Sequence, residues 1–129
     1  KLSTMKNKVF FVIYLLFGLL FINGGLNKFF NYMPMPENSP AEGMKDYAAM
    51  LEISWLMPLL ATAEIIGGIL FIMPKTRALG ALVIVPVMAG ILCAHIFVDT
   101  SALPIAIILL AILIWAIYEN RNKYLPLIK

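Results

Sequence analysis

Polar side chains that could carry chemistry stand inside, or at the ends of, long apolar stretches of this sequence. The candidates are Asn23, Asn27, Lys28, Glu64, His95 and Asp99. Glu64 is the most informative, because a charged side chain near the centre of a bilayer costs on the order of 3 kcal/mol. Such a carboxyl is either protonated or paired with a donor, for which Lys28 and protonated His95 both qualify. A structural hydrogen bond between helices and a role in proton transfer or ligand binding are both open.

The other candidates fall into two pairs with helical spacing and one lone cation. Asn23 and Asn27 share a helix face, where they either contact a ligand or hydrogen-bond across helices. Lys28 either joins the same site or extends to the lipid headgroups. Asp99 follows His95 by one helical turn. It either orients the imidazole toward a ligand or proton, or caps a helix end while His95 bonds a backbone carbonyl.

Counting residue types excludes several chemistries. The chain has one Cys and one His, so it forms no internal disulfide, no thiol–disulfide pair and no bis-His haem site by itself. It also lacks a glycine-rich phosphate loop and a zinc motif, and we expect no metal site. A redox role would therefore need a cofactor from a partner subunit or a diffusing quinone.

The composition assigns these side chains to a membrane protein. Of 129 residues, 62% are apolar and 13% are charged, whereas an average soluble domain has about 25% charged residues. The mean hydropathy is +0.92. A small soluble domain cannot bury that much apolar surface. An ordinary cytosolic enzyme, a disordered chain and a secreted disulfide-rich domain are all excluded.

The spacing of the charges predicts the elements that position the candidates. A spanning helix needs about 20 apolar residues, and the charges leave four such runs. The predicted spans are residues 9–30, 54–73, 78–98 and 103–118. Two short turns, at 74–77 and 99–102, would join antiparallel neighbours. We therefore expect a single all-α domain over residues 1–129, an up-down-up-down four-helix membrane bundle. The first run is too long for a signal peptide, so we expect it to be retained.

The connection over residues 31–52 predicts a further short helix. Ser39-Pro40-Ala41-Glu42 has the pattern of a capping box with proline at the first helical position. The residues that follow alternate polar and apolar positions with helical spacing. We expect an amphipathic helix over residues 40–51 that lies on the outer surface as a lid, with a plain linker as the alternative.

Basic residues predict the orientation. Eight of them fall on the side of both termini and of the 74–77 turn, and only Lys28 and Lys45 fall on the other side. Because short cytoplasmic loops are enriched in Lys and Arg, both termini should be cytoplasmic. This topology and attraction to anionic lipid explain the net charge of +3. No nucleic-acid partner is expected.

Depth along the spans groups the candidates on one side of the membrane. Counted at about 1.5 Å per residue, they lie between mid-membrane and the outer boundary, and the inner half has almost no polar group.

Small residues recur at helical spacing in the first three spans and predict close helix contacts. These are Gly18 and Gly25, Ala63 and Gly67, and Gly90 and Ala94.

Several of these segments resemble the DoxX-like family of small membrane proteins. Gly24-Gly25-Leu26-Asn27-Lys28-Phe29-Phe30 is similar to that family's G-x-x-K segment, and Glu64-Ile65-Ile66-Gly67-Gly68 to its E-x-x-G-G segment. His95 and the Met33–Pro36 loop are similar to one branch. The resemblance implies a four-helix protein of the bacterial inner membrane. Its relatives include a subunit type of thiosulfate:quinone oxidoreductase.

The resulting functional expectation is an accessory subunit of a larger membrane assembly. Its outer polar pocket would bind a small amphiphile, such as a quinone or a lipid. The expected partners are membrane lipid together with other membrane subunits or further copies of the chain. A redox subunit that delivers electrons to quinone is the first alternative, and a small transporter that acts as an oligomer is the second.

Overall fold

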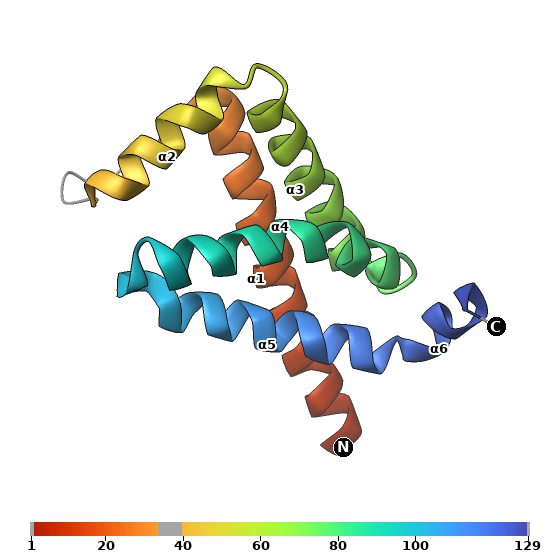
Figure 1. The fold of residues 1–129 in the computed structure, drawn as a ribbon. Helices are drawn as coiled ribbons and strands as arrows, with labels where there is room; N and C mark the ends of the chain where they lie inside the picture. Colours follow the sequence, from red (N-terminus) through yellow and green to blue (C-terminus); the bar gives the residue numbers. More distant parts are fainter. Residues whose placement is uncertain (1, 34–39, 129) are drawn as a thin grey trace.

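The computed structural model describes residues 2–33 and 40–128, and every regular element in those ranges is a helix (Figure 1). In chain order they are α1 (Leu2–Phe30), α2 (Ala41–Glu52), α3 (Leu56–Ile72), α4 (Arg77–Phe97), the 3-10 turn η1 (Thr100–Ala102), α5 (Leu103–Glu119), α6 (Arg121–Tyr124) and the 3-10 turn η2 (Leu125–Leu127). The predicted all-helical class is confirmed for the described residues.

Three helical stretches are long and apolar enough to cross a membrane. They are Thr4–Phe30, Arg77–Phe97 and Thr100–Glu119. α2 and α3 qualify as a fourth only when taken together, and they are bent by 96° at their junction. α3 alone has 17 residues, or about 26 Å of helix against a hydrocarbon core of about 30 Å. The chain is therefore a multi-pass membrane protein with three or four spans.

Glycines bring α1 and α3 into backbone contact. A Cβ atom built on Gly18 would lie 2.8 Å from the carbonyl oxygen of Gly68, and one built on Gly68 would lie 2.7 Å from that of Gly18. A Cβ atom on Gly25 would lie 2.6 Å from the carbonyl oxygen of Ala61. No side chain fits at these positions, so the helix contacts predicted for Gly18 and Gly25 are confirmed.

The contact predicted for Gly90 is wrong. A Cβ atom there would meet nothing within 4 Å. The close approach of α4 to α3 is made instead by Gly80, where a Cβ atom would lie 2.5 Å from the backbone nitrogen of Phe71. Gly67 takes part as predicted, because a Cβ atom there would lie 2.8 Å from Cγ1 of Ile84. A small residue shows where a neighbouring helix can come close, but the pattern does not show which of the small residues actually contact another helix.

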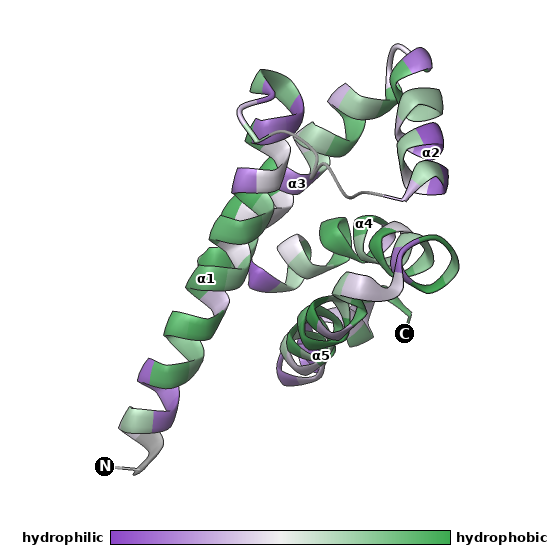
Figure 2. Cartoon of the chain, turned by 90° about the vertical axis from the view of Figure 1, so that its left-hand side faces the viewer, coloured by the Kyte–Doolittle hydropathy of each residue, from purple (hydrophilic) through white to green (hydrophobic). Residues whose placement is uncertain are grey.

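α4 and α5 form a pair that lies across α1. They are joined by η1 and run side by side, and Figure 1 shows both crossing α1, with the end of α3 beside the start of α4. In Figure 2, turned by 90°, the same two helices are seen nearly end-on while α1 runs down the picture. The predicted up-down-up-down order of spans is not confirmed by this arrangement and stays a prediction.

The core lies where α4 and α5 cross α1, next to the end of α3. Aromatic rings fill it, with Tyr14 edge-on to Phe71 at 5.4 Å between ring centroids and Phe17 at 4.6 Å from the same ring. Ala81 and Ala116 are fully buried, so the helices that carry them can approach this cluster closely. The rings thus hold α1 against the other helices at mid-length.

α2 has the amphipathic character that the sequence predicts. It spans Ala41–Glu52 and contains no buried residue. Figure 2 shows more polar positions along α2 than along α4 and α5, which are mostly apolar. Pro40 was predicted at the first helical position, but it stands one residue earlier, at the N-cap, where its ψ of 144° is not helical. The capping box predicted at Ser39 lies outside the described residues. The sharp bend at residues 53–55 turns α2 away from the axis of α3.

The glycine contacts lead to a first prediction. Gly68→Ala should lower the free energy of unfolding by about 1–3 kcal/mol, because the new methyl group must push α1 away from α3. Gly90→Ala is the matched control. It places the same methyl group in open space and should leave stability unchanged or raise it slightly, since Ala favours helix. Thermal unfolding of both variants in detergent checks this, and equal behaviour of the two would contradict it.

Candidate functional site

Glu64 is the one charged side chain of the described residues that is buried. It lies on α3 with 4% of its surface exposed. Space for the carboxylate exists because α1 carries a glycine opposite: a Cβ atom on Gly24 would lie 2.7 Å from Oε2 of Glu64. Ala61, one turn earlier on α3, is fully buried. The small residues around Glu64 therefore let its carboxylate lie between two helices.

Lys28 neutralises this carboxylate. Its Nζ atom lies 2.6 Å from Oε1 of Glu64, and the Lys28 and Glu64 side chains are 24% and 6% exposed. Of the alternatives that the sequence left open, the structure shows pairing with Lys28. The lysine therefore does not extend away to the headgroups. A charge-assisted hydrogen bond of this kind is short and strong. Removing one partner would leave the other charge unpaired in apolar surroundings.

Two cavities meet at the ion pair. The first, called here the α1 cavity, has a volume of about 250 Å³ and is lined by residues including Asn23, Gly24 and Leu109. The second, the α4 cavity, has about 360 Å³ and is lined by residues including Met50, Pro86 and Gly90. Lys28, Glu64 and Ile91 line both. The ion pair is thus the shared polar spot of two mostly apolar spaces.

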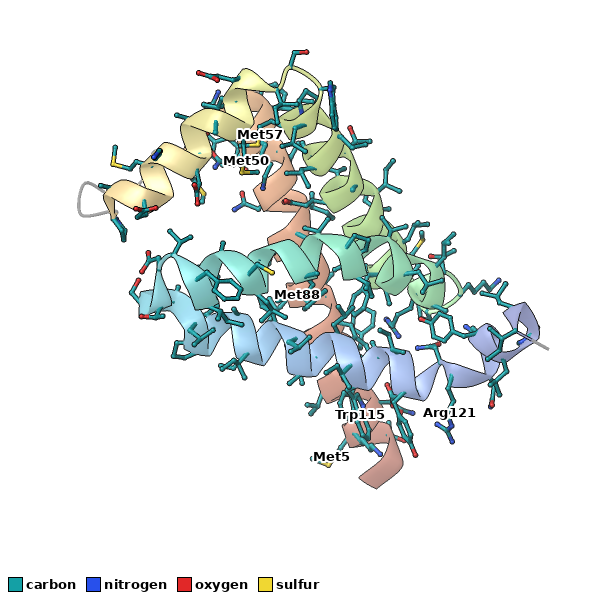
Figure 3. All side chains as sticks on the ribbon, in the orientation of Figure 1. Met5, Met50, Met57, Met88, Trp115 and Arg121 are labelled. Atoms are coloured by element: carbon teal, nitrogen blue, oxygen red, sulfur yellow. The ribbon has the colours of Figure 1, made fainter. Side chains whose placement is uncertain are left out.

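The α4 cavity explains why Gly90 makes no helix contact. Gly90 and Ala94 both face this space, so the small residues of α4 enlarge a cavity instead of admitting a neighbouring helix. Met50 closes the cavity from α2, and Figure 3 shows it on the side of α2 that faces α1 and α3. Methionine suits such a position because its side chain adapts to irregular apolar contacts.

Asn23 and Asn27 hold the chain that leaves α1. The Asn27 side-chain oxygen accepts a hydrogen bond of 2.7 Å from the backbone N–H of Met33. The Tyr32 hydroxyl donates to both the side-chain and the backbone oxygen of Asn23. Asn31 has φ of 53°, a left-handed conformation that Asn tolerates better than most residues. Asn23 also lines the α1 cavity, so the same side chain contacts both the turn after α1 and the candidate site.

His95 and Asp99 lie away from the ion pair, at the far end of α4. Neither lines the α1 or the α4 cavity. His95 Nδ1 is 3.2 Å from the carbonyl oxygen of Asp99, while the Asp99 side chain accepts bonds from the hydroxyl and the backbone N–H of Ser101. Those two donors hold the pKa of Asp99 below its ordinary value. The geometry is that of a helix-end cap.

The sequence missed a second polar cluster, on the other half of α1. The Tyr14 hydroxyl donates to Glu119 Oε1, and the Arg77 guanidinium lies over the Tyr14 ring at 4.2 Å from its centroid. Arg77 also donates to the carbonyl oxygens of Phe71 and Ile72. That half of the molecule is therefore not devoid of polar groups. Tyr14 is counted among the apolar residue types, and Glu119 is 105 residues away in the chain, so no local pattern indicates their contact.

No metal centre is formed by the described residues: no three of their His, Cys, Asp or Glu side chains come together. What the site offers is hydrogen bonding and charge. A lysine ammonium has three N–H donors, and one of them is directed at Glu64. The remaining donors can bind an acceptor oxygen at the mouth of either cavity, and the carboxylate can accept a proton.

Comparison with known protein families identifies a match over most of the chain. The family model DoxX matches residues 10–98, a segment that includes Lys28, Glu64 and His95 and ends before α5 begins. No curated protein and no solved structure matches the chain.

The ion pair leads to the second prediction. Lys28→Met should destabilise the protein by about 2–3 kcal/mol, because Glu64 is left buried without a cation. Adding Glu64→Leu to that variant should recover most of the loss, since two apolar side chains can replace a buried pair. Chemical unfolding of the single and double variants in lipid nanodiscs measures the coupling. Additive losses would show that the two side chains do not interact.

Proposed function

Because the chain belongs to the DoxX family, we propose that it is a membrane subunit that binds a small quinone-like amphiphile at the Lys28–Glu64 pair. The observation that carries this proposal is the ion pair at the junction of two apolar cavities. Ligand sites are usually apolar spaces with a few placed polar groups. A quinone ring with carbonyl oxygens matches that description.

The chemistry of the pair supports a binding role for the carbonyl end of the ligand. Lys28 can donate a hydrogen bond to a ring carbonyl while its charge remains balanced by Glu64. A bound quinone that is reduced takes up protons, and Glu64 lies within reach to relay one. The single Cys93 and the single His95 are not part of this site. We therefore assign electron transfer, where it occurs, to a partner subunit.

We further propose that the protein is a bacterial inner-membrane subunit with both termini in the cytoplasm. The eight-to-two distribution of basic residues supports this orientation. It places the Lys28–Glu64 pair toward the outer side and α2 at the outer surface. The predicted up-down-up-down order of four spans belongs to the same proposal, since an even number of spans returns both termini to one side.

Ligand binding is the third prediction. The protein in phosphatidylcholine nanodiscs should bind a short-tailed benzoquinone, and Lys28→Met should weaken binding about tenfold, the loss of one charged hydrogen bond. Glu64→Gln keeps the side-chain shape and should weaken it less. Lys8→Met, on the same helix but exposed, and Glu42→Gln, exposed on α2, are matched controls that should bind normally.

Equilibrium dialysis of the five proteins measures these affinities. Equal binding by all of them, or no binding by the parent protein, would contradict the proposed function. Co-purification separates the alternatives: a bound flavoprotein or sulfur-transfer partner would favour the redox subunit. A homo-oligomer that carries a solute flux would favour the transporter.

Orientation gives the fourth prediction. In a Cys93→Ser background, Ala41→Cys and Asn122→Cys place thiols at two exposed positions without changing any charge. A membrane-impermeant maleimide applied to intact spheroplasts should label Ala41→Cys and should label Asn122→Cys only after lysis. The reverse pattern would invert the proposed topology.

A further inference from the structure

The α1 cavity does not end at the ion pair but continues along α1. It shares Leu20 and Leu109 with a neighbouring cavity of about 350 Å³ that is also lined by Leu16 and Ile112. That middle cavity shares Ile13 and Ile112 with a third, of about 270 Å³. The third is lined by Phe10 and Trp115 and is called here the Trp115 cavity. The three together are the tail groove.

The charged and amide side chains of the tail groove all lie at one end. Its polar groups that face the ion-pair end are Asn23, Lys28 and Glu64. Every residue of the middle cavity is apolar, and the one hydroxyl in the Trp115 cavity, on Tyr14, is already bonded to Glu119. At the opposite end, Trp115 stacks on Phe10 with 5.8 Å between centroids, and Figure 3 shows it where α5 crosses α1. One polar end and a long apolar remainder are the complement of an amphiphile.

The length of the groove selects among amphiphiles. From Phe10 to Lys28 α1 advances by about 27 Å, at 1.5 Å per residue. One leaflet of a hydrocarbon core is only about 15 Å thick, so an acyl chain that stays in its own leaflet would fill about half of the groove. A polyprenyl chain can extend through both leaflets. The groove is open along its side, because Leu16 and Leu20 are 61% and 47% exposed, and a chain can enter from the bilayer.

The lining also argues against a partner helix as the occupant. Helices that pack in a membrane approach through small residues, whereas the groove is lined by Leu, Ile, Phe and Trp with Ala111 as its one small residue beyond Gly24. Bulky side chains with gaps between them suit a thin, flexible hydrocarbon chain.

We propose that the natural ligand is a long-tailed polyprenyl quinone whose ring sits at the Lys28–Glu64 pair and whose tail follows α1 to Trp115. This inference rests on the proposed function and specifies its substrate class. The tail is already in an apolar environment when the quinone is in lipid, so packing in the groove adds only a modest gain in affinity. At equal mole fraction in the bilayer, we expect the long-tailed quinone to bind about fivefold more tightly than the short-tailed one.

A matched pair of variants tests the groove. Leu16→Trp places an indole in the middle cavity, whereas Leu19→Trp places it at an exposed position of α1 that lines none of the three cavities. Leu16→Trp should remove the fivefold preference for the long tail while short-tailed binding stays within twofold. Leu19→Trp should keep the preference. Equal affinities of the parent protein for both tails, or equal effects of the two variants, would overturn the inference and leave the proposed function standing. No binding of either quinone would overturn both.

Fluorescence locates the tail directly. The chain has two tryptophans, and Trp55→Phe leaves Trp115 as the only tryptophan, which can be excited selectively over the tyrosines. A polyprenyl quinone brominated at the tail end should quench Trp115 more than its unbrominated analogue does. In Trp115→Phe, where Trp55 remains, the two analogues should quench equally. Absence of the bromine effect at Trp115, or a co-purified phospholipid that keeps the groove occupied, would overturn the inference.

Discussion

A carboxylate buried inside a membrane protein is the constraint on which this structure depends. Glu64 is tolerable there because Lys28 neutralises it at 2.6 Å and because Gly24 leaves room for its second oxygen. Both conditions require α1 and α3 to touch at backbone distance, which the Gly18–Gly68 contact provides. The aromatic cluster around Phe71 then holds α4 and α5 across this pair. The two cavities at the ion pair form where the crossing helices leave gaps, so the site follows from the packing.

The features that could be predicted from the sequence are those that depend on one local physical effect, such as the cost of placing a charge in lipid. Charges are expensive in lipid, and their spacing predicted membrane-spanning helices that α1, α4 and the α5 region match. The same cost predicted that Glu64 would point inward and be either protonated or paired with a donor, and the structure shows the pair with Lys28. The amphipathic pattern predicted α2, whose bounds, Ala41–Glu52, differ from the prediction by one residue at each end. The small residues of α1 and α3 predicted that these helices make close contacts, but not which helix each of them meets, and Gly67 meets α4.

Features set by the relative placement of distant elements were not predictable in this way. Which cation pairs with Glu64 depends on how α1 and α4 turn about α3, and the structure brings Lys28 to it while His95 stays at the end of α4. Gly90 matches a packing pattern but faces a cavity. The contact of Tyr14 with Glu119 follows from α5 crossing α1, an arrangement that no local pattern encodes. Asn23 and Asn27 were recognised as a shared face, but their bonds to the turn after α1 depend on its left-handed residue, Asn31.

The central claim, a direct Lys28–Glu64 ion pair inside the membrane, can be measured without any ligand. Magic-angle-spinning NMR of the protein in lipid bilayers, with ¹⁵N at Lys28 Nζ and ¹³C at Glu64 Cδ, reports the dipolar coupling between the two atoms. The account predicts the strong coupling of a hydrogen-bonded pair, together with the chemical shifts of an ammonium and an ionised carboxylate. Glu64→Gln should shift the Lys28 signal, while Glu42→Gln should not. No measurable coupling, or a Glu64 carbon with the shift of a neutral carboxyl group, would contradict it.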